Sequence, residues 1–127
     1  MARVEKWLAP FSWEMIVSLN EGLCAQKEAF HGPTSDGFEV TKNLWAQQHL
    51  KEMTLAEAVG LLRDCHRMAP FCFYNGNTFA SVALLIIRKL DLEPEKSFVV
   101  RSLAGHIVAG VSTGEEENAF QHFSDQL

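Results

Sequence analysis

Residues 70–79 read Pro-Phe-Cys-Phe-Tyr-Asn-Gly-Asn-Thr-Phe, an aromatic run that passes into Asn-Gly-Asn-Thr and then into the most apolar stretch of the chain. We expect a loop at residues 75–78 followed by a helix over residues 79–90. Backbone N–H groups at a helix start lack intrahelical acceptors, and the helix dipole favours an anion such as phosphate beside them. A purely structural turn fits the same residues, because Asn-Gly is a common turn pair and Asn77 or Thr78 would be an ordinary N-cap.

Composition indicates one globular domain over residues 1–127. The chain has 127 residues, of which 47% are hydrophobic and 21% charged, as is usual for a single domain with one core. The formal charge of -5 and the scattered Lys and Arg residues argue against nucleic-acid binding, which needs clustered positive charge. The longest apolar run, residues 82–87, is far shorter than the roughly 20 residues that cross a bilayer.

The cysteines and the N-terminal residues favour a cytoplasmic location. Cys24, Cys65 and Cys72 are an odd number at unpatterned spacing, which predicts free buried thiols in a reducing compartment. The first ten residues carry charges but no sustained apolar segment, so we expect no signal peptide.

Helical periodicity accounts for most of the chain. Ser12 is a predicted N-cap for a helix reaching about Phe30, Thr54 and Glu57 form a capping box for a helix to about Met68, and Pro94 is suited to a first turn. Residues 38–40 could be a brief extended piece before a weaker helix, and three glutamates begin a final helix after residue 114. The Val and Ile content of residues 98–111 leaves a helix and a hairpin both open.

Residues 65–72 contain the candidate reactive side chains. Cys65, His66 and Cys72 lack the spacing and the fourth ligand of a structural zinc site, so no metal site is predicted. Cys72 or Cys65 could act as a nucleophile near His66. However, His66 falls on the apolar arc of its helix, which predicts a buried core histidine.

Residues 73–77 resemble part of the Fic/Doc family motif, HxFx(D/E)(G/A)N(G/K)R. Phe73, Gly76 and Asn77 agree with it, and residues 80–85 resemble the buried helix that follows the motif. Residues 12–14 and 108–115 resemble the corresponding parts of short Doc-type proteins. The resemblance implies an all-α (mainly helical), compact, single-domain Fic/Doc-like helical bundle. A short hairpin or extended piece within this bundle is left open.

Family members transfer an adenylyl or phosphoryl group from a nucleotide to a protein hydroxyl. The resemblance assigns the motif His as base, its acidic residue to magnesium, and the loop with its Arg to the phosphates. Here these positions are Phe71, Asn75 and Phe79, and an alignment that starts from Ala69 also lacks the base. Phenylalanine can neither accept a proton nor bind an anion through charge.

We therefore expect a noncatalytic Fic/Doc-like binding or regulatory protein without cofactor or metal. It would bind a protein partner or a small ligand, with homo-oligomers possible, and the expected ligand loop is Tyr74, Asn75, Gly76, Asn77 and Thr78. One alternative is an adenylyl- or phosphotransferase, or another transferase, that uses ATP or GTP with magnesium and the candidate catalytic residues His66 and Cys72. A further alternative is an unrelated small helical interaction protein.

Overall fold

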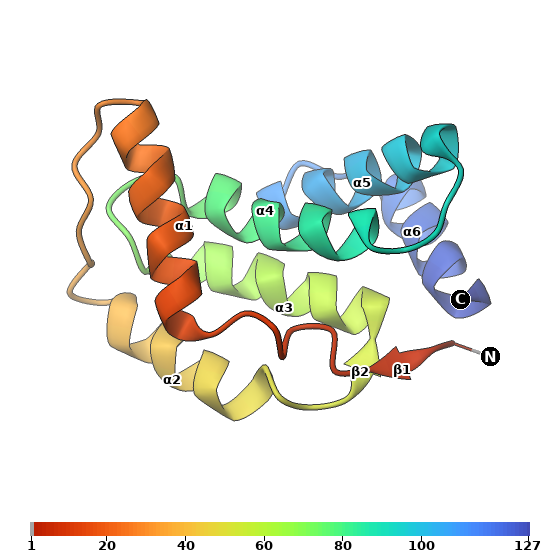
Figure 1. Cartoon of the computed structure of the whole chain (residues 1–127), viewed down its shortest axis with the longest axis horizontal. Helices are drawn as coiled ribbons and strands as arrows, with labels where there is room; N and C mark the ends of the chain where they lie inside the picture. The colour runs from red at the N-terminus through yellow and green to blue at the C-terminus, as the bar shows by residue number, and fades with distance from the viewer. Residues whose placement is uncertain (1) are drawn as a thin grey trace.

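The computed structural model describes residues 2–127, and this part of the chain forms six helices and one small sheet (Figure 1). The helices are α1 (Trp13–Gln26), α2 (Phe38–Gln48), α3 (Leu55–Met68), α4 (Asn75–Arg88), α5 (Pro94–Ala109) and α6 (Gly114–Gln126). The strands β1 (Val4–Glu5) and β2 (Met53–Thr54) pair antiparallel, with Val4 opposite Thr54 and Glu5 opposite Met53. The mainly helical fold predicted from the sequence is confirmed.

Helix α4 is the centre of the molecule. It packs against α1, α3 and α5, while α6 packs on α3 and α5. Figure 1 shows α4 and α5 side by side and running in opposite directions, with α3 below them. The N-terminal end of α4 therefore lies where the loop after α3 meets the C-terminal end of α5.

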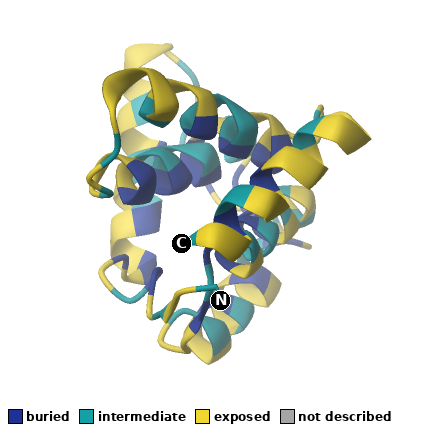
Figure 2. Ribbon diagram, turned by 90° about the vertical axis from the view of Figure 1, so that its right-hand side faces the viewer, coloured by how far each residue is buried: buried dark blue, intermediate teal, exposed yellow. Residues whose placement is uncertain are grey.

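One hydrophobic core connects all six helices. Buried residues line the inner faces of the helices in Figure 2, and exposed residues form the outside. The central helix supplies five of the buried apolar side chains, Phe79, Val82, Ala83, Ile86 and Ile87. The prediction that this segment is the central helix is confirmed.

Local capping explains why several helices begin where the sequence predicts. Thr54 accepts from the Glu57 N–H while Glu57 accepts from the Thr54 N–H, and Thr113 and Glu116 repeat this arrangement at α6. Pro94 is the first residue of α5, a position that requires no backbone N–H. Because α5 continues to Ala109, the hairpin alternative for residues 98–111 is wrong.

The first helix is shorter than predicted. It ends at Gln26 instead of near Phe30, and Glu28 adopts a left-handed backbone with φ 53°. Phe30 is 68% exposed and does not belong to the apolar face. The buried face of α1 consists of Trp13, Ile16, Asn20 and Cys24.

Two further expectations about local structure are wrong. Residues 38–40 are the first turn of α2 instead of an extended piece, and the strands lie elsewhere. Helix α4 starts at Asn75, so residues 75–78 are its first turn and not a loop before it. The N-cap is Tyr74 instead of Asn77 or Thr78.

The cysteines follow the prediction only in part. All three are free thiols, but Cys72 is exposed while Cys24 and Cys65 are buried.

Across residues 2–127, no helix combines the length and the apolar character that crossing a membrane requires.

Candidate functional site

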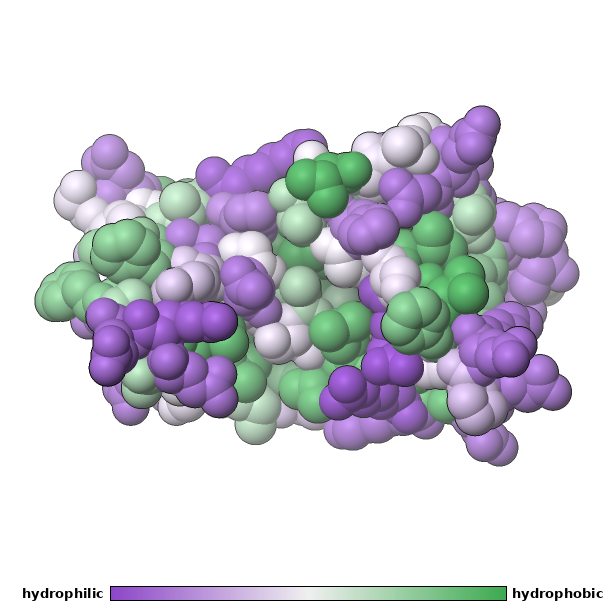
Figure 3. Space-filling view, turned by 90° about the horizontal axis from the view of Figure 1, so that it is seen from above, coloured by the Kyte–Doolittle hydropathy of each residue, from purple (hydrophilic) through white to green (hydrophobic). Residues whose placement is uncertain are grey.

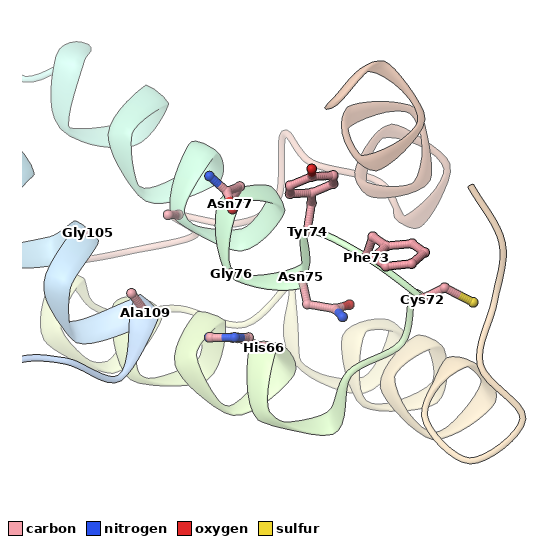
Figure 4. A pocket seen from close by; sticks show the side chains of 10 residues that line it. His66, Cys72, Phe73, Tyr74, Asn75, Gly76, Asn77, Gly105 and Ala109 are labelled. Atoms are coloured by element: carbon pink, nitrogen blue, oxygen red, sulfur yellow. The ribbon is translucent and has the colours of Figure 1, made fainter. Parts of the chain in front are cut away.

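A pocket of about 630 Å³ opens at the N-terminal end of α4 (Figure 4). Its wall comes from α3, from the loop between α3 and α4, from the first turns of α4 and from the last turns of α5. The lining residues are His66, Cys72, Phe73, Tyr74, Asn75, Gly76, Asn77, Ala80, Gly105 and Ala109. The structure thus brings His66 and most of the predicted ligand loop together around one pocket.

The loop before α4 is anchored at Phe71. Its side chain is 2% exposed and stacks on Trp13 with the ring centroids 6.0 Å apart. Its main chain is held by Asn75, whose Oδ1 accepts from the Phe71 N–H at 2.9 Å and whose Nδ2 donates to the Phe71 carbonyl at 2.7 Å. Phe71 and Asn75 therefore fix the loop, and the Asn75 amide has both of its polar atoms engaged.

Asn20 on α1 connects this loop to the rest of the protein. The side chain is fully buried, and its Nδ2 donates to the Phe73 carbonyl at 2.8 Å and to Thr78 Oγ1 at 3.0 Å. Its Oδ1 accepts from His31 Nδ1 at 2.8 Å. Sequence reasoning missed this residue, although an asparagine on an otherwise apolar helix face is a usable signal, since buried amides need partners.

The first turn of α4 presents free backbone donors. Tyr74 adopts a left-handed conformation with φ 61° and makes no side-chain capping bond. Within residues 2–127, the N–H groups of Gly76 and Asn77 have no hydrogen-bond acceptor. Both residues line the pocket, so these donors and the positive end of the helix dipole lie at its wall.

His66 lies on α3 with its ring against Gly76. A Cβ added at Gly76 would lie 3.1 Å from Cε1 and 3.3 Å from Nε2 of His66. His66 Nδ1 lies 2.7 Å from the Val108 carbonyl, which can only accept, so Nδ1 carries a proton and Nε2 of the neutral ring keeps a lone pair. His66 is half-buried at the pocket wall, and the prediction of a buried core histidine is wrong.

The other predicted residues have different surroundings. Thr78 is fully buried, and its hydroxyl donates to the Tyr74 carbonyl at 2.7 Å, so it serves the helix start instead of the pocket. In Figure 4 the Cys72 sulfur points away from His66, and it lies 3.7 Å from the Pro33 carbonyl. Cys72 and His66 are therefore not arranged as a nucleophile and its base.

The pocket has few charged groups. Of its lining side chains, only the imidazole of His66 can become a cation, and none is a carboxylate. Phe79 is fully buried in the core. In the described part of the chain, no cluster of three or more His, Cys, Asp or Glu residues could hold a metal ion.

The chain matches no family model, and comparisons with curated proteins and with solved structures found no match. The function of the pocket must therefore be argued from its own donors, its shape and its charge.

Proposed function

We propose that this chain is a noncatalytic binding protein that holds a small ligand by an anionic group at the N-terminal end of α4. One observation carries this proposal. The free N–H groups of Gly76 and Asn77 and the ring of His66 border the same pocket of about 630 Å³. Backbone donors at a helix start, together with an imidazole that can accept a proton, suit a carboxylate or a phosphate.

The charge of the pocket favours a ligand with little charge over a polyphosphate. No lysine or arginine lines the pocket, so nothing there pairs with several phosphates as an arginine clamp would. The chain itself carries a formal charge of -5. A single carboxylate or phosphate group is the chemistry that a few amide donors and one histidine can satisfy.

The same residues support a role without catalysis. Phe71 and Phe79 replace the base and the arginine of the Fic/Doc motif, and both side chains pack in the core. Asn75 stands at the acidic position, and its amide is engaged with the Phe71 main chain. A Fic/Doc-like frame that retains its helix N-terminus and lacks these groups would bind without transferring a group.

A second candidate function rests on His66. Because Nδ1 donates to Val108, the neutral ring presents Nε2 as a base beside Gly76. A nucleotide-dependent adenylyl- or phosphotransferase could use this nitrogen to take the proton of an attacking hydroxyl. ATP or GTP with magnesium would then be required, although no carboxylate of the pocket could hold the metal.

Amide NMR spectra recorded during titration with acetate and with inorganic phosphate test the first proposal. Chloride at matched ionic strength is the reference. We expect shifts at the Gly76 and Asn77 amides, and about tenfold weaker binding in His66→Gln, because a hydrogen bond to a charged group is lost. The control is His122→Gln, which changes an exposed histidine on α6.

Two results decide between the candidates. If neither anion shifts these amides more than chloride does, anion binding at α4 is contradicted. The second experiment incubates a protein with radiolabelled ATP or GTP, magnesium and either the wild type or His66→Gln. Labelling by the wild type alone would support a transferase in place of a noncatalytic binding protein. Absence of nucleotide binding at millimolar concentration would contradict the transferase reading.

A further inference from the structure

The pocket at α4 continues into a second hollow between α4 and α5. This hollow has a volume of about 260 Å³ and shares Gly105 with the pocket. Its lining residues are Leu84, Phe98, Arg101, Ser102, Gly105 and His106. We call the pocket and this hollow together the α4–α5 groove.

Helical spacing makes the groove continuous along both helices. On α4, Asn77, Ala80 and Leu84 follow one another at intervals of three and four residues, which places them on one side of the helix. On α5, the lining residues 98, 102, 105 and 109 do the same, and Arg101 and His106 lie next to them. At about 1.5 Å per residue, the α4 side of the groove is roughly 10 Å long.

The groove becomes apolar away from the pocket. Leu84 and Phe98 line its outer part, and Phe98 is 65% exposed. Figure 3 looks down on α4 and α5 and shows green and pale side chains along the middle of this face, between purple ones. An exposed aromatic side chain in a hollow next to a binding pocket indicates that apolar surface is available for a ligand.

Gly105 keeps the junction of the two hollows open. A Cβ at this position would meet no atom within 4 Å, so nothing in the packing requires a glycine there. Glycine inside a helix is less stable than alanine. A larger side chain at residue 105 would project into the groove and separate its apolar part from the pocket.

We propose that the α4–α5 groove binds a single-chain amphiphilic anion, with its carboxylate or phosphate group at the N-terminal end of α4 and its apolar tail along Leu84 and Phe98. This inference rests on the proposed function, because it places the anionic group at the same donors. In the described part of the chain, no carboxylate lines either hollow, whereas Arg101 lines the outer one. His106 lines it too but is paired with Glu116 at 2.5 Å, so it is Arg101 and the N-terminal end of α4 that favour an anion over a cation. A peptide would need acceptors for its backbone N–H groups, and the polar side chains that line the outer hollow are mainly donors, namely Arg101, His106 and the Ser102 hydroxyl.

A series of alkyl carboxylates tests the tail. Acetate, butanoate, hexanoate and octanoate are titrated as monomers into the full chain, and their dissociation constants are compared by NMR. A fully buried methylene strengthens binding about fourfold, so in an open groove we expect about twofold for each added methylene. Hexyl phosphate against inorganic phosphate repeats the comparison for the second head group.

Gly105→Leu tests the contribution of the apolar tail separately from that of the anionic group. In this variant the gain from acetate to octanoate should fall to less than twofold in total, with its own affinity for acetate as the reference for that ratio. The matched control is Gly22→Leu, because Gly22 also lies in a helix with no atom within 4 Å of an added Cβ, but on α1 outside the groove. Unchanged far-ultraviolet circular dichroism confirms that both variants fold.

Each other outcome overturns the inference. Equal affinity for acetate and octanoate in the wild type contradicts the tail site while leaving the proposed anion site intact, and failure of every anion contradicts both. Equal binding of octylamine shows that the anionic group is not recognised. Binding to phosphatidic acid vesicles without stronger binding of monomeric octanoate than of acetate would show that the α4–α5 groove contacts a membrane surface instead. A dimer of the protein that Gly105→Leu abolishes would show that the groove contacts a second copy of this chain instead.

Discussion

Asn20 is the residue on which the shape of the candidate site depends most. It lies on α1, yet it donates to a carbonyl in the loop before α4 and to a hydroxyl in the first turn of α4. Its carbonyl oxygen lies 2.8 Å from His31 Nδ1 and 3.6 Å from Cys24 Sγ. One buried amide therefore satisfies donors and acceptors from three separate segments, and it holds the loop against α1.

Replacing Asn20 with alanine should destabilise the fold by about 2 kcal/mol, because the Phe73 carbonyl and the His31 ring lose a buried partner. The free energy of unfolding in urea measures this loss. Asn77→Ala is the control, since Asn77 is exposed on α4, and it should change stability by less than about 0.5 kcal/mol. Equal effects of the two substitutions would show that the buried amide does not hold the loop.

The residues of the site could be predicted from the sequence only where their roles are local. Gly76 and Asn77 were recognised as a helix start with free donors, and both line the pocket. The roles of Asn20 and His66 depend on partners 58 and 42 residues away, Thr78 and the Val108 carbonyl. No local pattern contains such contacts, which is why the position of His66 was wrongly predicted.

At the scale of the elements, the end of α5 shows how one residue type serves two purposes. Gly105 lies inside the helix, whereas Gly110 follows it with φ 78°, and the Val111 N–H donates to the His106 carbonyl at 3.0 Å. This is the hydrogen bond of a Schellman end, which favours glycine because of its left-handed backbone. An added Cβ would meet no atom within 4 Å at either position.

Alanine substitutions at these two glycines should therefore have opposite effects. Gly105→Ala should stabilise the fold by about 0.5 to 1 kcal/mol through helix propensity. Gly110→Ala should destabilise it by about 1 kcal/mol, because alanine is strained in the left-handed region. Thermal and urea unfolding measure both, and a change of the same sign in the two variants would contradict the backbone explanation.

The start of α6 should make stability depend on pH. The hydrogen bond from His106, at 2.5 Å, and the Thr113 N–H lower the pKa of Glu116 from its usual 4.5. Because the folded chain favours the carboxylate, Glu116 stabilises the fold above pH 4.5, and this contribution disappears as the pH falls through the lowered pKa.

The difference in unfolding free energy between the wild type and Glu116→Gln measures that contribution. It should be largest near neutral pH and should shrink below pH 4.5, the usual pKa of the carboxyl group. Glu115→Gln removes a charge from the same helical turn without touching the His106 pair, so its effect should change less with pH. A difference that grows as the pH falls would reverse the predicted sign.

Helix starts were predictable where the stabilising contacts lie within one turn. Thr54 and Glu57 are three residues apart, and the predicted helix matches α3 to its end at Met68. The predicted start of α4 was wrong because the helix begins directly after Tyr74, whose backbone is left-handed. Tyr74 follows a loop whose main chain is held by hydrogen bonds from the Asn75 and Asn20 side chains. Such a start is set by tertiary contacts instead of by local preference.

For the molecule as a whole, the three thiols report on how the core opens. Cys24 and Cys65 are 1% and 0% exposed, and they lie on the inner faces of α1 and α3. Burial, with a smaller effect of Asp64, raises the pKa of the Cys65 thiol to about 12. Cys72 is exposed in the loop before α4. Because the thiolate is the reactive form, the buried thiols should react only when the fold opens.

Brief treatment of the native protein with iodoacetamide near pH 8 should therefore modify Cys72 alone, as intact-mass spectrometry would show. Cys72→Ser should remain unmodified under the same conditions, while guanidinium should expose all three thiols of the wild type. Since Cys65 is fully buried in the core, its slow alkylation should follow global unfolding. In Asn20→Ala it should accelerate about tenfold for each 1.4 kcal/mol of stability lost. Rapid native labelling of Cys65 would mean that α3 opens independently, and the core would then not behave as the one cooperative unit that its shared packing implies.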